Sequence, residues 1–315
     1  MKHLFAFILC ACLAAPALRA LTTSCAVPGT DNAFLGIQTV RLWPGTPPDA
    51  KGDTCFDIPA LTILNPRQGS GNGSAVVIFP GGGYSHLAGD LEGREVADWF
   101  TARGFVAFIL SYRLPSHGYL LPVPLLDARR AIQTVRARAM DYHIDPNRIV
   151  VIGFSAGGHL AALAGTQFVP GKPDAEDPID RVSSRPDFLV LGYPWLGAIG
   201  PDFDHLNYCK VFNLVDQCDA LRAKYDPVLF VTKDTPPTFI YHTFNDKTVP
   251  IQQSIDFFQA LVKAGVQSEY HVFASGAHGS GLGKGDAALD QWPNLLEKWL
   301  HAQGLLTAEK EVGAK

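Results

Sequence analysis

The stretch RIVVIGFSAGGHLAALAG, residues 148–165, places one serine between two glycines at the junction of two kinds of sequence. The β-branched run before the serine is typical of a buried strand, and the alanine- and leucine-rich run after it is typical of a helix. A sharp turn from strand to helix exposes the hydroxyl of Ser155 and presses Gly153 and Gly157 against neighbouring backbone, where a side chain would collide. The amide of Ala156 then lies at the helix N-terminus, where free N–H groups favour negative charge. The stretch therefore predicts a nucleophilic serine with an oxyanion donor beside it.

Short apolar runs and helical patterns alternate on both sides of this turn. Strands are expected at ALTIL 60–64, AVVIF 75–79, FVAFILS 105–111, RIVVI 148–152, FLVLG 188–192, TFIYH 238–242 and EYHVF 269–273. Apolar residues recur at helical spacing over 92–103, 125–140 and 252–263. The alternation predicts an α/β fold with a mostly parallel central sheet and helices on both faces.

Length and composition fit one domain of this kind. The chain has 315 residues, of which 47% are hydrophobic and 18% charged, and α/β domains reach ~250 to 300 residues without splitting. The Pro- and Gly-rich part up to about residue 73 is expected to form loops and edge strands. Two polar or aperiodic stretches, at about 166–186 and 195–235, are expected to be loop excursions at the rim of the site.

Three loops that follow predicted strands carry the partners that a nucleophilic serine needs. The sequence AVVIFPGGGYS offers the amides of Gly82 and Gly83 as further oxyanion donors. Asp246 follows one later strand in HTFNDKTVP, and His278 follows the next in SGAHGSG. This order of serine, acid and histidine is that of the α/β-hydrolase triad. In it, His278 takes the serine proton and returns it to the leaving alcohol, while Asp246 fixes the imidazole tautomer.

Other polar residues are weaker candidates. His159 lies one turn into the helix after the serine and is expected to be a packed, hydrogen-bonded core residue. His86 and His117 are expected in loops, either solvated or in contact with substrate. Asp256 is expected on an exposed helix face. Asp286 follows His278 in the sequence, whereas the acid of a triad is expected before the histidine. No histidine or cysteine spacing suits a metal, and neither glycine-rich stretch continues as a phosphate loop, so no metal or cofactor is expected.

The N-terminus MKHLFAFILCACLAAPALRA has the layout of a secretory signal peptide over residues 1–20, with cleavage after Ala17 or Ala20. Its apolar stretch is shorter than the ~20 residues that a membrane-spanning helix needs. A single domain from 21 to 315 would remain, either periplasmic or secreted.

Four cysteines follow this segment, namely Cys25, Cys55, Cys209 and Cys218. An even number in an exported protein favours disulfides, and short loop closure favours pairing Cys25 with Cys55 and Cys209 with Cys218. Four buried free thiols are the alternative.

The charge of the chain excludes one class of partner. The formal net charge is −4, and losing Lys2 and Arg19 leaves 24 basic against 30 acidic residues, or −6. Without a run of lysine or arginine, no nucleic-acid partner is expected.

An ordered set of motifs runs from about residue 76 to 300. It comprises FPGGGYS, SYRL, LLDARRAIQTVRA, DPNRIVVIGFSAGGHLAA, DTPPTFIYHTFNDKTVP and AHGSGL. With these motifs the chain resembles the bacterial α/β-hydrolase esterases of the acetyl-xylan and feruloyl esterase-like group. The resemblance implies the α/β-hydrolase fold and a serine esterase with Ser155, Asp246 and His278 as its triad. It also implies an oxyanion hole from Gly82, Gly83 and Ala156.

The resemblance further implies small O-acyl groups on plant-type carbohydrates as substrates. We therefore expect an exported esterase that removes small acyl groups, acetyl above all, from carbohydrates such as acetylated xylan or its oligosaccharides. A feruloyl or aryl esterase is the alternative, with Tyr84, Tyr193 and Trp195 as candidate walls of a larger pocket. A binding module on a hydrolase scaffold is the distant alternative. Asn245 departs from the family pattern, in which a second acidic residue often stands there, and so does the segment from 195 to 232.

Overall fold

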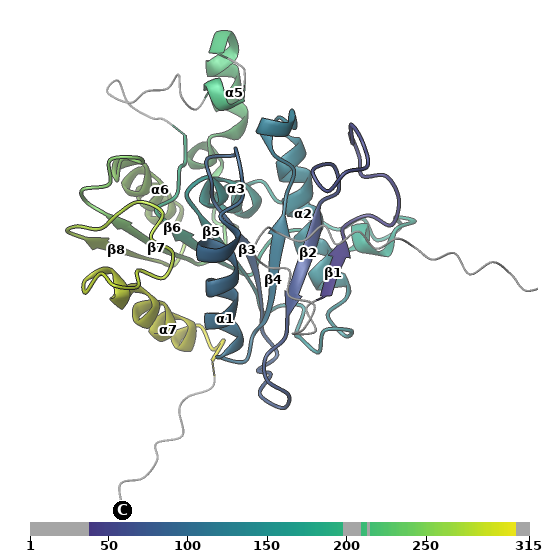
Figure 1. Cartoon of the computed structure of the whole chain (residues 1–315), viewed down its shortest axis with the longest axis horizontal. Helices are drawn as coiled ribbons and strands as arrows, with labels where there is room; N and C mark the ends of the chain where they lie inside the picture. Colours follow the sequence, from purple (N-terminus) through teal and green to yellow (C-terminus); the bar gives the residue numbers. More distant parts are fainter. Residues whose placement is uncertain (1–37, 198–208, 213–214, 307–315) are drawn as a thin grey trace, which may run out of the picture.

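An eight-stranded sheet runs through the protein (Figure 1). The computed structural model describes residues 38–197, 209–212 and 215–306. The strands are β1 (Gln38–Arg41), β2 (Ala60–Leu64), β3 (Ala75–Phe79), β4 (Val106–Ser111), β5 (Ile149–Phe154), β6 (Phe188–Gly192), β7 (Thr238–Thr243) and β8 (Ser268–Phe273). Their order is β1-β2-β4-β3-β5-β6-β7-β8, with β2 antiparallel to both of its neighbours and every other pair parallel.

All seven strands expected from the sequence are present within two residues of their predicted bounds. The antiparallel strands β1 and β2 lie in the Pro- and Gly-rich N-terminal part, for which loops and edge strands were expected. Only β1 is an edge strand, because β2 pairs with both β1 and β4. Because β3 and β5 to β8 are parallel, the loops that follow them meet at one edge of the sheet, where α/β folds place their ligands.

Helices cover both faces of the sheet. They are α1 (Glu95–Thr101), α2 (Val123–Ala137), α3 (Ser155–Thr166), α5 (Cys218–Tyr225), α6 (Gln252–Ala264) and α7 (Trp292–Ala302). The three helical patterns of the sequence correspond to α1, α2 and α6. The helices α5 and α7 were not predicted from the sequence, although the spacing of Leu296, Trp299 and Leu300 in α7 is typical of a helix.

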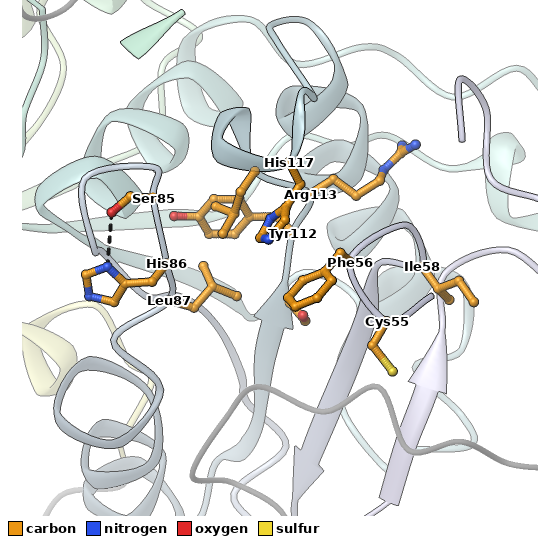
Figure 2. A pocket seen from close by; sticks show the side chains of 11 residues that line it. Cys55, Phe56, Ile58, Ser85, His86, Leu87, Tyr112, Arg113 and His117 are labelled. Atoms are coloured by element: carbon orange, nitrogen blue, oxygen red, sulfur yellow. Dashed lines mark hydrogen bonds between the residues drawn. The ribbon is translucent and has the colours of Figure 1, made fainter. Parts of the chain in front are cut away.

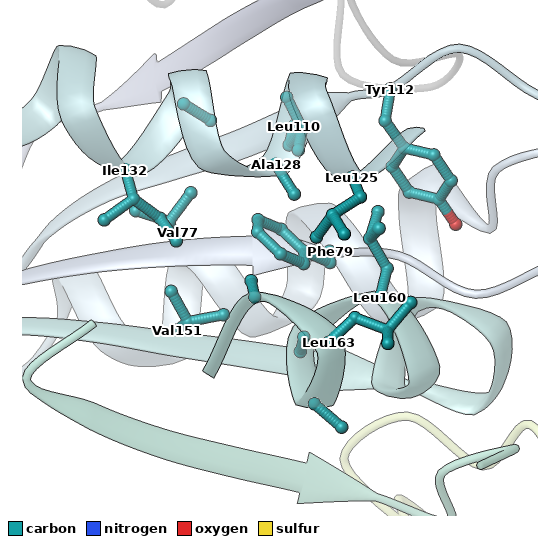
Figure 3. Close-up of a cluster of buried hydrophobic side chains, with 14 of the residues drawn as sticks. Val77, Phe79, Leu110, Tyr112, Leu125, Ala128, Ile132, Val151, Leu160 and Leu163 are labelled. Carbon is teal, nitrogen blue, oxygen red and sulfur yellow. The ribbon is translucent and has the colours of Figure 1, made fainter. Parts of the chain in front are cut away.

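Alternate side chains of each strand pack on opposite faces. In β3, Val77 and Phe79 join the core beneath α2, α3 and α6, whereas Val76 and Ile78 join the core beneath α1 and α7. Figure 3 shows the first core, in which Phe79 lies among Leu125 of α2, Leu160 and Leu163 of α3 and other buried side chains. Since both faces are covered, the strands read as continuous apolar runs.

Both expected excursions contact other parts of the protein, and the second contains the helix α5 in addition to loops. The loop at 166–186 is held to α2, where Arg130 Nη1 lies 2.9 Å from Asp180 Oδ1. In the second excursion a disulfide joins Cys209 to Cys218, and the ring of Phe212 packs at 5.2 Å from that of Tyr84. Within the described part of the chain this excursion therefore lies against the loop that follows β3.

Three sequence predictions fall outside the described residues. The predicted signal peptide at 1–20 lies outside them, and so does Cys25, the expected partner of Cys55. Cys55 itself is described and is disulfide-bonded. Residues 198–208 and 213–214 of the second excursion also lie outside the described residues. None of the helices in the described ranges has the length and apolar character needed to cross a bilayer.

The buried face of α7 is expected to stabilise the fold measurably. Leu296 is fully buried in the core beneath α1 and α7, so Leu296→Ala should lower the free energy of unfolding by about 2 to 5 kcal/mol. Urea unfolding followed by circular dichroism measures this. Lys298→Ala, on the exposed side of the same helix, should stay within about 0.5 kcal/mol of wild type. Equal losses from both variants would contradict this account of α7.

Candidate active site

Ser155 lies at the turn that the sequence predicts. β5 ends at Phe154 and α3 begins at Ser155, whose backbone φ of +50° is a conformation that non-glycine residues seldom adopt. A Cβ on Gly153 would lie 2.2 Å from the carbonyl oxygen of Gly157, and a Cβ on Gly157 would lie 2.1 Å from that of Phe79. Both glycines are therefore required by close backbone approach.

The side chains of Ser155, His278 and Asp246 lie in one line of hydrogen bonds. His278 Nε2 is 2.9 Å from Ser155 Oγ, and His278 Nδ1 is 2.7 Å from Asp246 Oδ2. Because Nδ1 faces a carboxylate, it carries the proton, which leaves Nε2 free to accept one from the serine hydroxyl. The three residues follow the ends of β5, β7 and β8, so the parallel sheet brings them together.

Asp246 receives several hydrogen bonds that hold it in place as an anion. Its Oδ1 accepts from the backbone N–H groups of Thr248 at 2.8 Å and Val249 at 2.9 Å. Its Oδ2 also lies 3.2 Å from Nε2 of the buried His242. Burial acts to raise the pKa of Asp246, but the bonds from His242, His278 and Val249 outweigh it and hold that pKa well below its usual range.

The loop after β3 presents free amides beside Ser155. Gly82 and Gly83 have φ of +120° and +61°, and no described residue accepts a hydrogen bond from their N–H groups. The N–H of Gly81 is taken, because it donates to Glu92 Oε2 at 2.7 Å. Ala156, in the first turn of α3, has an N–H without a partner within the helix. The three residues expected to be oxyanion donors thus lie in the two segments next to the serine.

Several other candidates have structural partners instead. His159 is fully buried, with Nδ1 2.7 Å from the hydroxyl of Tyr84 and Nε2 3.0 Å from the carbonyl oxygen of Tyr225, as expected of a core residue. Asp286 caps the turn before α7 by accepting from the N–H groups of Ala288 and Leu289. Tyr84 and Tyr193, considered as pocket walls, are buried and about 1% exposed.

A cavity of about 600 Å³ opens beside the loop after β3. Figure 2 shows Ser85, His86 and Leu87 of that loop on one side and Phe56 and Ile58 on the other. Its lining is mostly apolar, and the exposed rings of Phe56 and His117 stack at a centroid distance of 4.0 Å. Both His86 and His117, which the sequence leaves open as surface or substrate contacts, thus line the same cavity.

Three side chains near the site were missed or misread in the sequence. His242 was read only as part of a strand, although it stands four residues before Asp246. Glu92 was read only as part of a helix, and Tyr193 was considered only as a pocket wall. Their burial depends on long-range contacts, so no local pattern reports it. The loop residue Asn245, which departs from the family pattern, accepts from the N–H of Gly276 at 3.1 Å and so links the loops of Asp246 and His278.

Among the described residues, no group of three or more His, Cys, Asp or Glu side chains is arranged to hold a metal ion. A mostly parallel sheet with a serine on a strand-to-helix turn, hydrogen-bonded through a histidine to an aspartate, defines a hydrolase of the α/β-hydrolase fold.

Similarity to known proteins identifies the family of this hydrolase. A family model described as BD-FAE matches residues 61–180, and one described as the prolyl oligopeptidase family matches residues 205–303. An acetyl ester-xyloside bifunctional hydrolase from Caldicellulosiruptor lactoaceticus is 38% identical, with a TM-score of 0.79 over 86% of this chain and 97% of that one. The chain belongs to the α/β-hydrolase esterases.

Two further relatives extend the comparison. An acetylxylan esterase from Xylanibacter ruminicola is 30% identical over 234 residues, which are 73% of this chain and 45% of that protein. The esterase Est2 from Thermogutta terrifontis is 26% identical, with a TM-score of 0.70 over 90% of this chain and 97% of that one. The chain spans only 45% and 32% of the lengths of the acetylxylan esterase and of an endo-1,4-beta-xylanase B from Butyrivibrio fibrisolvens.

The buried imidazole of His159 predicts a pH dependence of stability. Burial lowers the pKa of His159 from 6.5 to about 4. Between these values the unfolded chain binds a proton that the folded chain does not. The free energy of unfolding should therefore fall by about 3 kcal/mol from this residue as the pH drops from 6.5 to about 4.

Urea unfolding at a series of pH values tests this contribution. His159→Gln should flatten the curve between pH 6.5 and 4, whereas the exposed control His143→Asn should follow wild type. Parallel curves for His159→Gln and wild type would contradict the assignment.

Proposed function

We propose that Ser155, His278 and Asp246 form the catalytic triad of an exported esterase, with Gly82, Gly83 and Ala156 as its oxyanion hole. The enzyme removes small acyl groups, acetyl above all, from carbohydrates such as acetylated xylan or its oligosaccharides. The observation that carries the proposal is the continuous line of hydrogen bonds from Ser155 Oγ through His278 to Asp246.

The reaction proceeds in two halves. Ser155 Oγ attacks the ester carbonyl carbon while its proton moves to His278 Nε2, and the N–H groups of the oxyanion hole receive the developing negative charge. The tetrahedral intermediate collapses, the C–O bond to the alcohol breaks, and His278 returns the proton to the leaving alcohol. Water then repeats the sequence on the acyl-enzyme, releasing the carboxylic acid and free Ser155.

Asp246 supports both halves. Its carboxylate keeps the Nδ1 tautomer of His278 and favours the imidazolium that forms twice in each cycle. Its low pKa keeps it ionised over the range in which esters are hydrolysed by serine enzymes.

The substrate class rests on relatives named for it, an acetyl ester-xyloside hydrolase and an acetylxylan esterase. Export rests on the layout of residues 1–20 and is supported by the disulfide between Cys209 and Cys218, since disulfides persist in oxidising compartments. The partner is thus an acylated carbohydrate or another small ester.

An aryl or feruloyl ester is the second candidate, favoured by one observation. The cavity beside the loop after β3 is mostly apolar, with Phe56 and Leu87 in its lining, and its volume of about 600 Å³ lies in the range of pockets that hold drug-sized ligands. Est2 has, moreover, been solved with propionate and with butyrate bound. Acyl size therefore has to be tested directly.

Ser155→Ala should lower turnover of p-nitrophenyl acetate by several orders of magnitude, because the triad acts as a unit and only binding and oxyanion effects remain. The fold should persist, as judged by circular dichroism. Ser70→Ala, an exposed serine in the segment between β2 and β3, serves as the control and should keep wild-type turnover. Near wild-type turnover by purified Ser155→Ala would overturn the triad.

A hydrolysis profile separates the two substrate candidates. We expect acetyl esters to exceed butyryl and longer esters in kcat/KM, and acetylated xylo-oligosaccharides to exceed methyl ferulate, because overlap in a short acyl pocket exceeds the ~1 to 3 kcal/mol gained per methylene. If kcat/KM is highest for butyrate or longer esters, or if methyl ferulate is preferred, the proposed acetylated carbohydrate is wrong and the substrate is a longer-chain or aryl ester. That result would leave the three catalytic residues in place.

A further inference from the structure

A buried carboxylate that forms no ion pair with any described residue lies behind the candidate oxyanion hole. Glu92, in the turn that leads into α1, is 3% exposed. Its Oε2 accepts the N–H of Gly81 at 2.7 Å, and its Oε1 accepts the hydroxyl of Tyr193 at 2.8 Å. Burying a carboxylate costs free energy unless hydrogen bonds or charges compensate it, and burial raises the pKa of Glu92 although both bonds act to lower it.

This carboxylate is close to the nucleophile. A Cβ built on Gly81 would lie 2.5 Å from Glu92 Oε2 and 3.1 Å from the Cβ of Ser155. The carboxylate and the serine therefore flank the same side of Gly81. Since the N–H of Gly81 points to Glu92, the loop is anchored one residue before Gly82 and Gly83, whose amides are free.

Tyr193 continues the contact to the opposite wall of the site. It follows β6 and is 1% exposed, and its hydroxyl accepts the N–H of Gly281 at 2.9 Å while donating to Glu92. The carbonyl oxygen of Gly281 is held in turn by the hydroxyl of Tyr241 at 3.0 Å and by Trp292 Nε1 at 3.1 Å. The peptide groups on both sides of Gly281 are thus fixed three residues beyond His278.

Tyr193 also contacts the histidine itself. Its ring meets that of His278 edge-on at a centroid distance of 4.9 Å. One tyrosine thus supports the imidazole by packing and its loop by a hydrogen bond.

We propose that Glu92 and Tyr193 are positioning residues that couple the oxyanion loop to the loop of the general base, through the chain Gly281 N–H, Tyr193 hydroxyl, Glu92 carboxylate, Gly81 N–H. This inference rests on the proposed function of Ser155, His278 and the oxyanion amides. This series of hydrogen bonds holds both loops in position relative to Ser155 before the substrate binds. Its contribution therefore falls on the transition state, in which oxyanion donors and base act together, rather than on substrate binding.

Replacing either residue breaks a defined link. In Glu92→Gln one carboxylate oxygen becomes an amide NH2, which cannot accept a hydrogen bond, so either Gly81 N–H or the Tyr193 hydroxyl loses its acceptor. Tyr193→Phe keeps the ring against His278 but removes both the donor to Glu92 and the acceptor for Gly281. Glu92→Ala removes both links at the loop after β3.

The test measures kcat and KM for p-nitrophenyl acetate per active site, with active sites counted by fluorophosphonate labelling. We expect Glu92→Gln and Tyr193→Phe each to lower kcat per labelled serine about 10-fold or more, with KM within about threefold of wild type. Glu92→Ala should be more severe than Glu92→Gln. The double variant Glu92→Gln/Tyr193→Phe should be little worse than the more severe single variant, because both residues belong to one chain of contacts. Asp98→Asn, on the exposed side of α1, is the matched control and should keep wild-type kcat.

Counting active sites separates this role from a merely structural one, which would lower the number of labelled serines and leave kcat per labelled serine unchanged. That outcome, or additive losses in the double variant, would overturn the coupling. Wild-type turnover by Ser155→Ala would instead overturn the proposed function itself. A Ser155→Ala variant that is inactive beside fully active Glu92 and Tyr193 variants would overturn the coupling alone.

Discussion

The site depends on one close approach of backbone to backbone. Gly157, in the first turn of α3, lies so near the carbonyl oxygens of Phe79 and Pro80 that a Cβ would be 2.1 and 2.5 Å from them. This contact packs α3 against the end of β3 and brings the loop of Gly82 and Gly83 beside Ser155. Ser155 and the candidate oxyanion donors therefore depend on the same contact, which a single methyl group at residue 157 would break.

Around that contact, the two buried carboxylates accept hydrogen bonds from several neighbouring groups. Asp246 receives hydrogen bonds from His278, His242 and two backbone amides, and Glu92 receives them from Tyr193 and Gly81. Each unpaired group would cost about 1 to 3 kcal/mol in a buried site. These hydrogen bonds consequently hold the loops that follow β3, β6, β7 and β8 in place.

The chemistry of the site and its selectivity have different structural origins. The serine, aspartate and histidine follow the parallel strands β5, β7 and β8, whose positions are set by the sheet and by the core on both of its faces. The cavity beside the loop after β3 is lined by side chains from loops and the end of β4, among them Phe56, His86 and His117. Loops vary without disturbing the sheet, so a serine esterase site of this kind is compatible with several alcohols and acyl groups.

The sequence by itself predicted seven of the eight strands, the helices α1, α2, α3 and α6, and the serine, aspartate and histidine that the structure brings together. Its patterns were informative where a feature depends on residues close together in the sequence. The two glycines around Ser155 and the apolar runs of the covered strands are such features. It missed α5 and α7 and could not show that His242 and Glu92 are buried beside Asp246 and Gly81. It also left Tyr193 as a candidate pocket wall. These assignments depend on contacts between residues as distant as Glu92 and Tyr193, or Tyr193 and Gly281, and only the packing of β6, the turn before α1 and the loop of His278 brings those side chains within hydrogen-bonding distance.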